Sequence, residues 1–183
     1  MIKKMTVGVF GVLIMIVALG TRVTIAQQEV ELAVGDAAPT FVLRDMQDDD
    51  VFLRDFCGQL RQPWKNKTKH VVILSFFTSY CKPCLKEIPE LQKIAAEFGE
   101  NDLKVFLVNL KEDKELVQKY IAEKGFTLPV LLDRYGMIAK KYGVTSVPRI
   151  FIIDKEGNIA WLTKGYDEKL AENIHQALNE LFE

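Results

Sequence analysis

Residues 75–91, "SFFTSYCKPCLKEIPEL", decide the fold, because they join a strand pattern to a helix pattern through a pair of cysteines. The apolar run Val71–Phe77 is rich in β-branched and aromatic residues, which is typical of a central strand buried on both faces. After Cys81 and Cys84, apolar residues recur every three or four positions and predict a helix: Leu85, Ile88, Leu91, Ala95 and Phe98. Pro89 is expected to kink this helix and Gly99 to end it.

The rest of the chain continues this alternation. Further strands are predicted at 103–110 and 128–132, and at "VPRIFIID" with its return strand "IAWLTKG". Helices are predicted around Leu116, Tyr120 and Ile121, over 137–142, and at the carboxyl end on a face formed by Leu170, Ile174, Leu178 and Leu181. Residues 41–43 and 51–53 predict a hairpin around an acidic turn. This order predicts an α/β fold with a mixed sheet covered by helices.

The amino-terminal segment has the pattern of a secretory signal. Residues 1–26 carry Lys3 and Lys4, then an apolar core over 7–19, then small residues that end at Ala26. The apolar core is shorter than the roughly 20 residues of a spanning helix. An uncleaved amino-terminal membrane anchor is the alternative. We expect one domain over residues 35–183 and a periplasmic or other extracytoplasmic location.

Composition excludes some functions. The chain of 183 residues has a net charge of −1, and loss of residues 1–26, which hold three cations and no acid, would leave −4. No basic stripe is present to neutralise phosphates, so no nucleic-acid partner is expected. Three cysteines are too few for a disulfide-stapled scaffold. One close pair in an exported protein indicates redox chemistry or metal binding.

The position of the pair favours redox chemistry. The first turn of a helix has unpaired N–H groups and a partial positive charge, which stabilise a thiolate and lower its pKa. Cys81, at the helix start, is the candidate nucleophile, and Cys84 is the candidate resolving thiol. Lys82 adds a cation beside the nucleophile. Glu87, one turn after Cys84, has the opposite effect, because a nearby carboxylate raises a thiol pKa. Glu87 can also relay a proton to or from Cys84.

The pair has two other interpretations, a metal site and a structural disulfide. A structural zinc site needs four Cys or His ligands, and nothing in the sequence places His70, His175 or Cys57 near the pair. A purely structural disulfide would close too short a loop to constrain the unfolded chain. We expect no metal and no cofactor, so electrons must come from outside the chain. Cys57 is predicted to be a buried apolar residue, with a third redox thiol as the alternative.

Several segments resemble the thioredoxin superfamily and, within it, the exported TlpA-like or ResA-like thiol-disulfide oxidoreductases. "FFTSYCKPC" and "CLKEIPELQKI" are similar to the family's active-site strand and helix. "VGDAAPTFVLRD" is similar to the hairpin of TlpA-like and peroxiredoxin-like members. "YGVTSVPRIFIID" resembles the segment that holds the family's cis-proline. The resemblance implies a thioredoxin-like three-layer sandwich, with a mixed central sheet, helices on both faces and an N-terminal β-hairpin.

The resemblance also implies site residues. The cis-proline would be Pro148, and the preceding Val147 would pair its backbone with an extended substrate. Glu87 matches an acid that TlpA-like members carry three residues after the second cysteine. Tyr80 stands where Trp is usual, so the substrate-binding surface beside the nucleophile differs. Ser75 stands where thioredoxin has a buried acid, which leaves Glu87 as the proton relay.

The expected function is an exported enzyme that reduces disulfides in extracytoplasmic proteins. The resemblance implies a membrane-embedded thiol reductase as electron donor and cytochrome c maturation as one task. A disulfide oxidase or isomerase, a redox-gated binding module and a metallochaperone are the alternatives. The loop over 59–70, which contains the sequon Asn66-Lys67-Thr68, looks longer than the usual family connection and is interpreted as a neutral insertion rather than a partner-contact element.

Overall fold

In the computed structural model, residues 31–63, 68–99 and 102–183 are described. These residues form a seven-stranded mixed sheet in the order β2-β1-β5-β4-β3-β6-β7. The strands are β1 (Val42–Asp45), β2 (Asp50–Phe52), β3 (Val71–Phe77), β4 (Leu103–Leu110), β5 (Val130–Asp133), β6 (Arg149–Ile153) and β7 (Ile159–Lys164). The helices are α1 (Cys84–Phe98), α2 (Lys114–Lys124), α3 (Met137–Lys141) and α4 (Leu170–Phe182), with a short 3-10 turn at Leu53–Asp55.

The sheet is parallel at its centre and antiparallel toward both edges. β3 pairs parallel with β4, and β4 pairs parallel with β5. β6 and β7 extend the sheet antiparallel on one side, as the sequence predicts. On the other side β1 pairs antiparallel with β5, so the amino-terminal hairpin continues the same sheet. All seven residues of β3 are buried, which confirms the predicted central strand.

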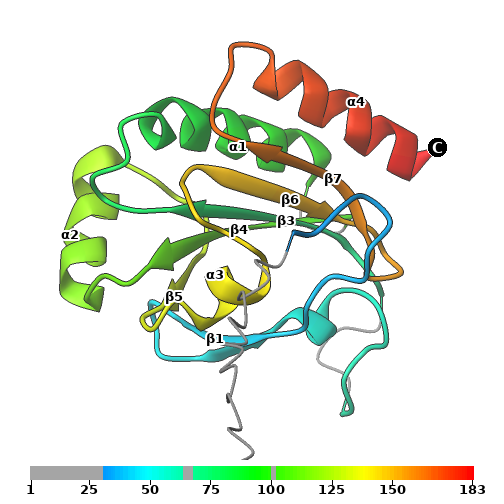
Figure 1. Cartoon of the computed structure of the whole chain (residues 1–183), viewed down its shortest axis with the longest axis horizontal. Coiled ribbons are helices and arrows are strands. Elements are labelled where there is room, and N and C mark those ends of the chain that lie inside the picture. The colour runs from blue at the N-terminus through cyan, green and yellow to red at the C-terminus, as the bar shows by residue number, and fades with distance from the viewer. Residues whose placement is uncertain (1–30, 64–67, 100–101) are drawn as a thin grey trace, which may run out of the picture.

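Helices cover both faces of the sheet (Figure 1). The core on one face packs the sheet against α1, α2 and α4, and α1 and α4 lie side by side there. The core on the other face packs it against α3 and the lead-in chain. This is the predicted three-layer thioredoxin-like arrangement. Burial of one apolar side chain contributes about 1.5–3 kcal/mol, so both cores hold the central strands firmly.

Two predicted helix faces are partly wrong. Leu116 is 50% exposed, and Val117 and Tyr120 are the buried residues of α2. Leu85 is 39% exposed, and the first turn of α1 instead buries Cys84 and Glu87. Leu85 and Leu116 are apolar but point away from the sheet, and the neighbouring residues Cys84 and Val117 are buried in their place. Helix α1 continues through Pro89 to Phe98, and Gly99 follows it with a positive φ of 75°.

Candidate active site

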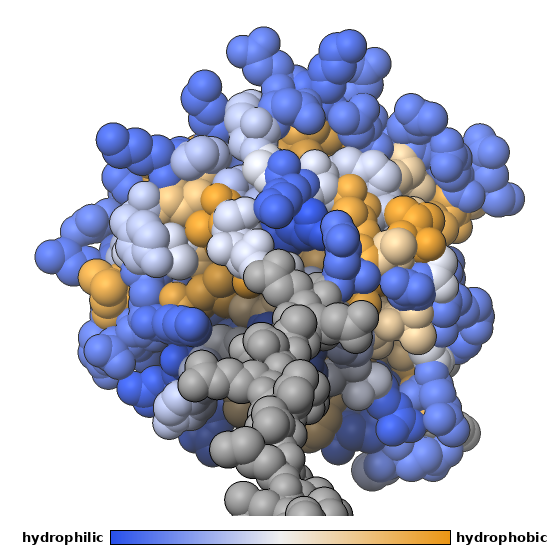
Figure 2. All heavy atoms as spheres, viewed as in Figure 1, coloured by the Kyte–Doolittle hydropathy of each residue, from blue (hydrophilic) through white to orange (hydrophobic). Residues whose placement is uncertain are grey.

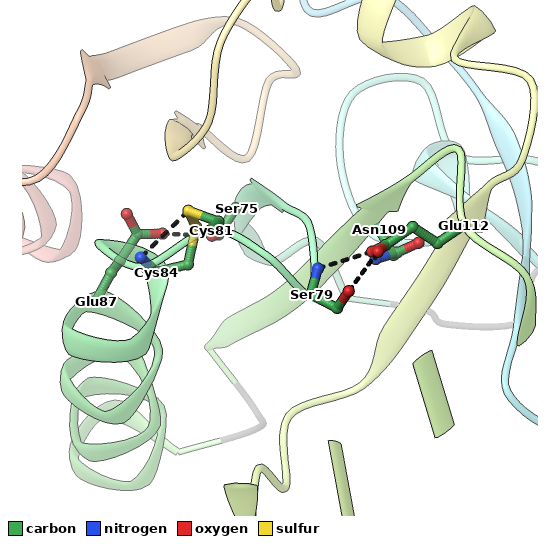
Figure 3. The surroundings of a disulfide bond; sticks show 7 residues. All are labelled: Ser75, Ser79, Cys81, Cys84, Glu87, Asn109 and Glu112. Carbon is green, nitrogen blue, oxygen red and sulfur yellow. Dashed lines mark hydrogen bonds between the residues drawn. A yellow bond between two sulfur atoms is a disulfide. The ribbon is translucent and has the colours of Figure 1, made fainter. Parts of the chain in front are cut away.

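The cysteine pair lies at the carboxyl end of β3, in the turn that leads into α1. Cys81 and Cys84 form a disulfide with a Cα–Cα distance of 5.4 Å (Figure 3). The helix begins at Cys84, so Cys81 lies just before it, three residues earlier than the first helical residue. The backbone N–H of Cys84 donates to Sγ of Cys81 at 3.3 Å. The helix therefore directs one of its free amino-terminal donors at the predicted nucleophile.

Burial distinguishes the two sulfurs. Cys81 is 6% exposed, whereas Cys84 is fully buried in the core beneath α1. An external disulfide can approach the first cysteine more readily than the second. This asymmetry suits an attacking thiol followed by a resolving thiol, as the sequence predicts.

Glu87 is buried one turn after Cys84, and Figure 3 shows its carboxyl group turned toward the end of α1 that carries the disulfide. Burial, together with the nearby charge of Glu90, raises the pKa of Glu87 to about 7, against a hydrogen bond from Ser75 that lowers it. That bond runs from the Ser75 hydroxyl to Oε1 of Glu87 at 2.5 Å. The other carboxyl oxygen, Oε2, is buried and has no hydrogen-bond partner among the described residues. Glu87 can therefore gain or lose a proton near neutral pH beside the dithiol.

A second acid, Glu90, interacts electrostatically with Glu87 and was not predicted from the sequence. Its Oε1 accepts a hydrogen bond of 3.0 Å from the Tyr166 hydroxyl, which lies between β7 and α4. The spacing of three residues between Glu87 and Glu90 on one helix was the available signal. Glu90 acts on the site through its charge, by favouring the neutral form of Glu87.

The turn before Cys81 is held by another acid that sequence reasoning missed. Oε2 of Glu112 accepts the backbone N–H of Ser79 at 2.8 Å and the side-chain amide of Asn109 at 2.6 Å. Oε1 of Glu112 accepts the Ser79 hydroxyl (Figure 3). Asn109 is the parallel-sheet partner of Phe77, so β3 and β4 end at the same edge. Polar residues that follow two neighbouring parallel strands were the signal for this contact.

The predicted substrate-binding residues come together beside the dithiol. The Val147–Pro148 peptide bond is cis, as the resemblance implies, and Val147 packs against the core cluster that contains Cys81. Tyr80 is 77% exposed. Tyr80 and Val147 both line a cavity of about 720 Å³ that extends toward α3.

The remaining cysteine and histidines lie elsewhere. Cys57 is 2% exposed, and burial raises the pKa of its thiol to about 12, which confirms the prediction of a buried apolar-like residue. His70 precedes β3, at the opposite end of that strand from the dithiol, and His175 lies on α4 against Glu97 of α1. Within the described ranges, no group of three or more His, Cys, Asp or Glu residues is placed to hold a metal ion.

The amino-terminal segment 1–26 and most of the sequon lie outside the described residues. Within the part of the chain that is described, no helix has the length and apolar character to cross a membrane. The described ends of the 59–70 loop are tied to the domain: Arg61 pairs with buried Asp55 at 3.0 Å, and the Lys69 ammonium pairs with Glu156 at 2.6 Å.

Comparisons with known proteins agree with this geometry. The Redoxin family model matches residues 33–180. Thiol-disulfide oxidoreductase ResA of Geobacillus thermodenitrificans is 30% identical over 171 residues, which cover 92% of this chain and 91% of that protein. A Chlorobium tepidum structure described as a thiol:disulfide interchange protein, DsbE, has a TM-score of 0.72 at 27% identity, covering 84% of this chain and 100% of its own.

A Bacteroides thetaiotaomicron structure described as a protein disulfide isomerase has a TM-score of 0.71 at 28% identity, covering 82% of this chain and 90% of its own. Family match, relatives and structural neighbours converge on the fold and on one reaction type. The chain belongs to the Redoxin family and is a TlpA/ResA-like thiol-disulfide oxidoreductase of the thioredoxin superfamily.

Proposed function

We propose that this enzyme reduces disulfides in extracytoplasmic proteins, with Cys81 as nucleophile, Cys84 as resolving thiol and Glu87 as proton relay. One arrangement carries the proposal: the first N–H of α1 donates to Sγ of Cys81, and a buried acid with a pKa of about 7 follows one turn later. Donor and acid supply the two requirements of the exchange, a stabilised thiolate and a place for a proton.

In the first step, the Cys81 thiolate of the reduced enzyme attacks one sulfur of a substrate disulfide. A Cys81–substrate disulfide forms, the substrate S–S bond breaks, and the other substrate sulfur leaves as a thiolate that takes a proton from water. The α1 N–H favours the thiolate before the attack.

In the second step, Cys84 attacks Sγ of Cys81. Cys84 is buried, and burial in apolar surroundings raises a thiol pKa, so it needs a base. The Glu87 carboxylate takes the Cys84 proton, the Cys81–Cys84 disulfide forms, and the remaining substrate sulfur leaves as a thiolate. Two electrons have then passed from the enzyme dithiol to the substrate disulfide.

Substrate is positioned by the segment around Pro148. Val147 lies outside β6, and the described residues provide no backbone partner for it. Its N–H and C=O groups can therefore pair with an extended substrate, as an added strand pairs with a sheet edge. Tyr80 presents an exposed ring next to the nucleophile.

A second dithiol must restore the reduced enzyme, and we propose a membrane-embedded thiol reductase as this donor. Residues 1–26, with their secretory pattern, support an extracytoplasmic site of action, as a cleaved signal or as an anchor. Maturation of cytochrome c, in which a cysteine pair must be kept reduced, is one task that such an enzyme could serve.

Insulin reduction by the full chain tests the proposal. Cys81→Ser should abolish activity, whereas Cys84→Ser should trap a mixed disulfide on Cys81 that mass spectrometry detects. Cys57→Ala is the matched control and should keep full activity, because Cys57 is buried away from the pair. Unchanged activity in Cys81→Ser would reject the assignment.

The likeness to a protein described as a disulfide isomerase favours one second candidate, net oxidation or isomerisation. The reduction potential of the Cys81/Cys84 couple separates the two directions. A value near about −180 mV or higher favours an oxidase or isomerase, and a value closer to about −270 mV favours a reductant.

A further inference from the structure

The cavity beside Tyr80 and Val147 is the most distinctive surface near the dithiol. It has a volume of about 720 Å³, within the range of ligand-binding pockets, and it runs from the turn before Cys81 to α3. Apolar side chains reach the protein surface at several places (Figure 2), so apolar exposure alone does not identify a binding surface. The charge of the lining distinguishes this cavity.

The charged residues that line the cavity are Lys111 and Lys140, and no acid is among the lining residues. Neither lysine forms an ion pair with a carboxylate among the described residues. The chain as a whole has a net charge of −1, so this cationic lining runs against the overall balance. Two uncompensated ammonium groups in a concave surface favour an anionic occupant.

Nearby acids are engaged elsewhere. Glu112, the neighbour of Lys111, uses both carboxyl oxygens to hold the turn that carries Ser79. Asp113 pairs with Arg134 at 3.1 Å. Asp133 is buried and accepts the backbone N–H of Ala139 at 2.8 Å. Among the described residues, none of these acids forms an ion pair with Lys111 or Lys140.

The backbone places Lys111 against the cavity wall. Lys111 has a φ of 56°, in the left-handed region, and its N–H donates to the Asp133 carbonyl at 3.1 Å. Its side chain crosses Gly136 so closely that a Cβ added there would lie 2.3 Å from Cε of Lys111. A larger residue at position 136 would make the Lys111 side chain shift, and Gly136 has a φ of 65° that favours glycine.

Two aromatic rings frame the same cavity. Tyr80 is 77% exposed and Tyr135 is 78% exposed. Exposed tyrosines offer a flat apolar face with a polar tip, and they contribute to recognition of peptides more than their number suggests. The cavity thus combines aromatic walls with positive charge, next to the sulfur that attacks the substrate.

We propose that this cavity binds the substrate residues that flank the attacked cysteine, and that it selects polypeptides with an acidic side chain beside an apolar or aromatic one. The inference rests on the proposed function, because it assigns a substrate class to the same site. The carboxylate meets Lys111 and Lys140, and the apolar neighbour packs on Tyr80 or Tyr135.

Competition for Cys81 tests this selectivity without turnover. The full-length Cys84→Ser variant is mixed with equimolar disulfide peptides that differ in one residue near the cysteine, Glu in one and Lys in the other. The acid is placed one or two residues before or after the cysteine, and mass spectrometry counts the mixed disulfides. Partly exposed ion pairs contribute modestly to affinity, so the Glu peptide should be enriched about twofold to tenfold at low salt.

Comparison with a charge-reversed variant of the enzyme cancels any difference in intrinsic reactivity between the two peptides. A Glu or Lys beside a cysteine changes the pKa of the peptide thiol, but this effect is the same for every enzyme variant. Lys111→Glu/Lys140→Glu, made in the Cys84→Ser background, should therefore lower the Glu-to-Lys ratio about fivefold or more relative to its parent. Lys93→Glu, an exposed site on α1, is the control for net charge and should leave most of the ratio unchanged.

The outcomes separate the two proposals. Equal ratios in the parent and the double variant overturn the cavity inference even if insulin is reduced normally. Glu selectivity in the Cys84→Ser parent, together with a wild-type chain that fails to reduce insulin, supports the cavity and contradicts the reductase proposal. Lys93→Glu with the same loss as the double variant means that long-range charge, not this cavity, sets the preference, and overturns the inference.

Discussion

The hydroxyl of Ser75, in the middle of β3, donates a 2.5 Å hydrogen bond to Oε1 of Glu87 in the first turn of α1. Both residues are fully buried. A hydrogen bond to the ionised form of a carboxyl group lowers its pKa, whereas burial raises it. The pKa of Glu87, about 7, is the balance of these opposed effects and of the charge of Glu90.

Substitution Ser75→Ala should therefore raise the pKa of Glu87 further. The carboxylate loses its donor while the burial stays, so the neutral form gains. The acid limb of the pH profile for kcat/KM in disulfide reduction should move to higher pH. The double variant Ser75→Ala/Glu87→Gln is the control and should show the same profile as Glu87→Gln alone. A profile for Ser75→Ala identical to wild type would contradict this role.

Substitution Glu87→Gln should alter the pH dependence of stability. The pKa of Glu87 rises from 4.5 in the unfolded chain to about 7 in the fold, so the folded protein binds more protons within this window. Its stabilising contribution is complete below pH 4.5 and is lost as pH rises through about 7. At 1.36 kcal/mol per unit, the free energy of unfolding should fall by up to about 3 kcal/mol across the window.

Glutamine has no charge to desolvate, so Glu87→Gln should lack this fall and should exceed wild type in stability at pH 8, although it turns over more slowly. Denaturant unfolding of the oxidised proteins at pH 5 and pH 8 measures the change in the free energy of unfolding for wild type and for Glu87→Gln. Glu180→Gln, exposed on α4, is the matched control and should behave as wild type. Parallel pH dependence in Glu87→Gln and wild type would be incompatible with a buried titrating carboxyl at this position.

The strand and helix around the cysteines could be predicted because periodicity, burial and turn residues agree there. The predicted strands 71–77 and 103–110 match β3 and β4. The prediction of which helix residues face the sheet was less accurate. An apolar residue indicates that a helix has a buried side, but Leu85 and Leu116 show that it need not itself lie on that side. Which residue faces the sheet depends on where the helix starts, and α1 starts three residues after Cys81.

Site residues could be predicted where they share one local element or where the family resemblance supplied them. Cys81, Cys84 and Glu87 lie within seven residues of one another. Glu112 could not be found that way, because its contact with Ser79 joins positions 33 residues apart. The contact exists because β3 and β4 run parallel and end together, which is a property of the sheet and not of either segment.

Thiol reactivity should differ among the three cysteines of the reduced protein. The N–H of Cys84 donates to Sγ of Cys81, which stabilises a Cys81 thiolate. Cys81 should therefore react with iodoacetamide at pH 7 faster than free cysteine does, and Cys84 more slowly. Burial raises the pKa of Cys57 to about 12, so Cys57 should stay unmodified in the folded protein. In urea all three should react alike. A Cys81 no more reactive than free cysteine would remove the basis for its role.

Substitution of Glu112 should loosen the turn that carries Cys81. Its carboxylate accepts three hydrogen bonds, two from Ser79 and one from Asn109. Bonds to a charged group are worth about 1.5–3 kcal/mol each, and loss of the acceptor leaves partly buried donors unpaired. Glu112→Ala should lower the free energy of unfolding by about 2–4 kcal/mol, and Glu112→Gln, which keeps one acceptor oxygen, by about half as much.

Denaturant unfolding at pH 7 measures this loss, and Glu115→Gln, an exposed acid three residues along the chain, supplies the baseline. If the turn positions Cys81, Glu112→Ala should also reduce the alkylation rate of Cys81 in the reduced protein, since the sulfur no longer stays in line with the α1 donor. A variant as stable as wild type, with Cys81 alkylated at the wild-type rate, would show that α1 alone holds the nucleophile and that the link from β4 is dispensable.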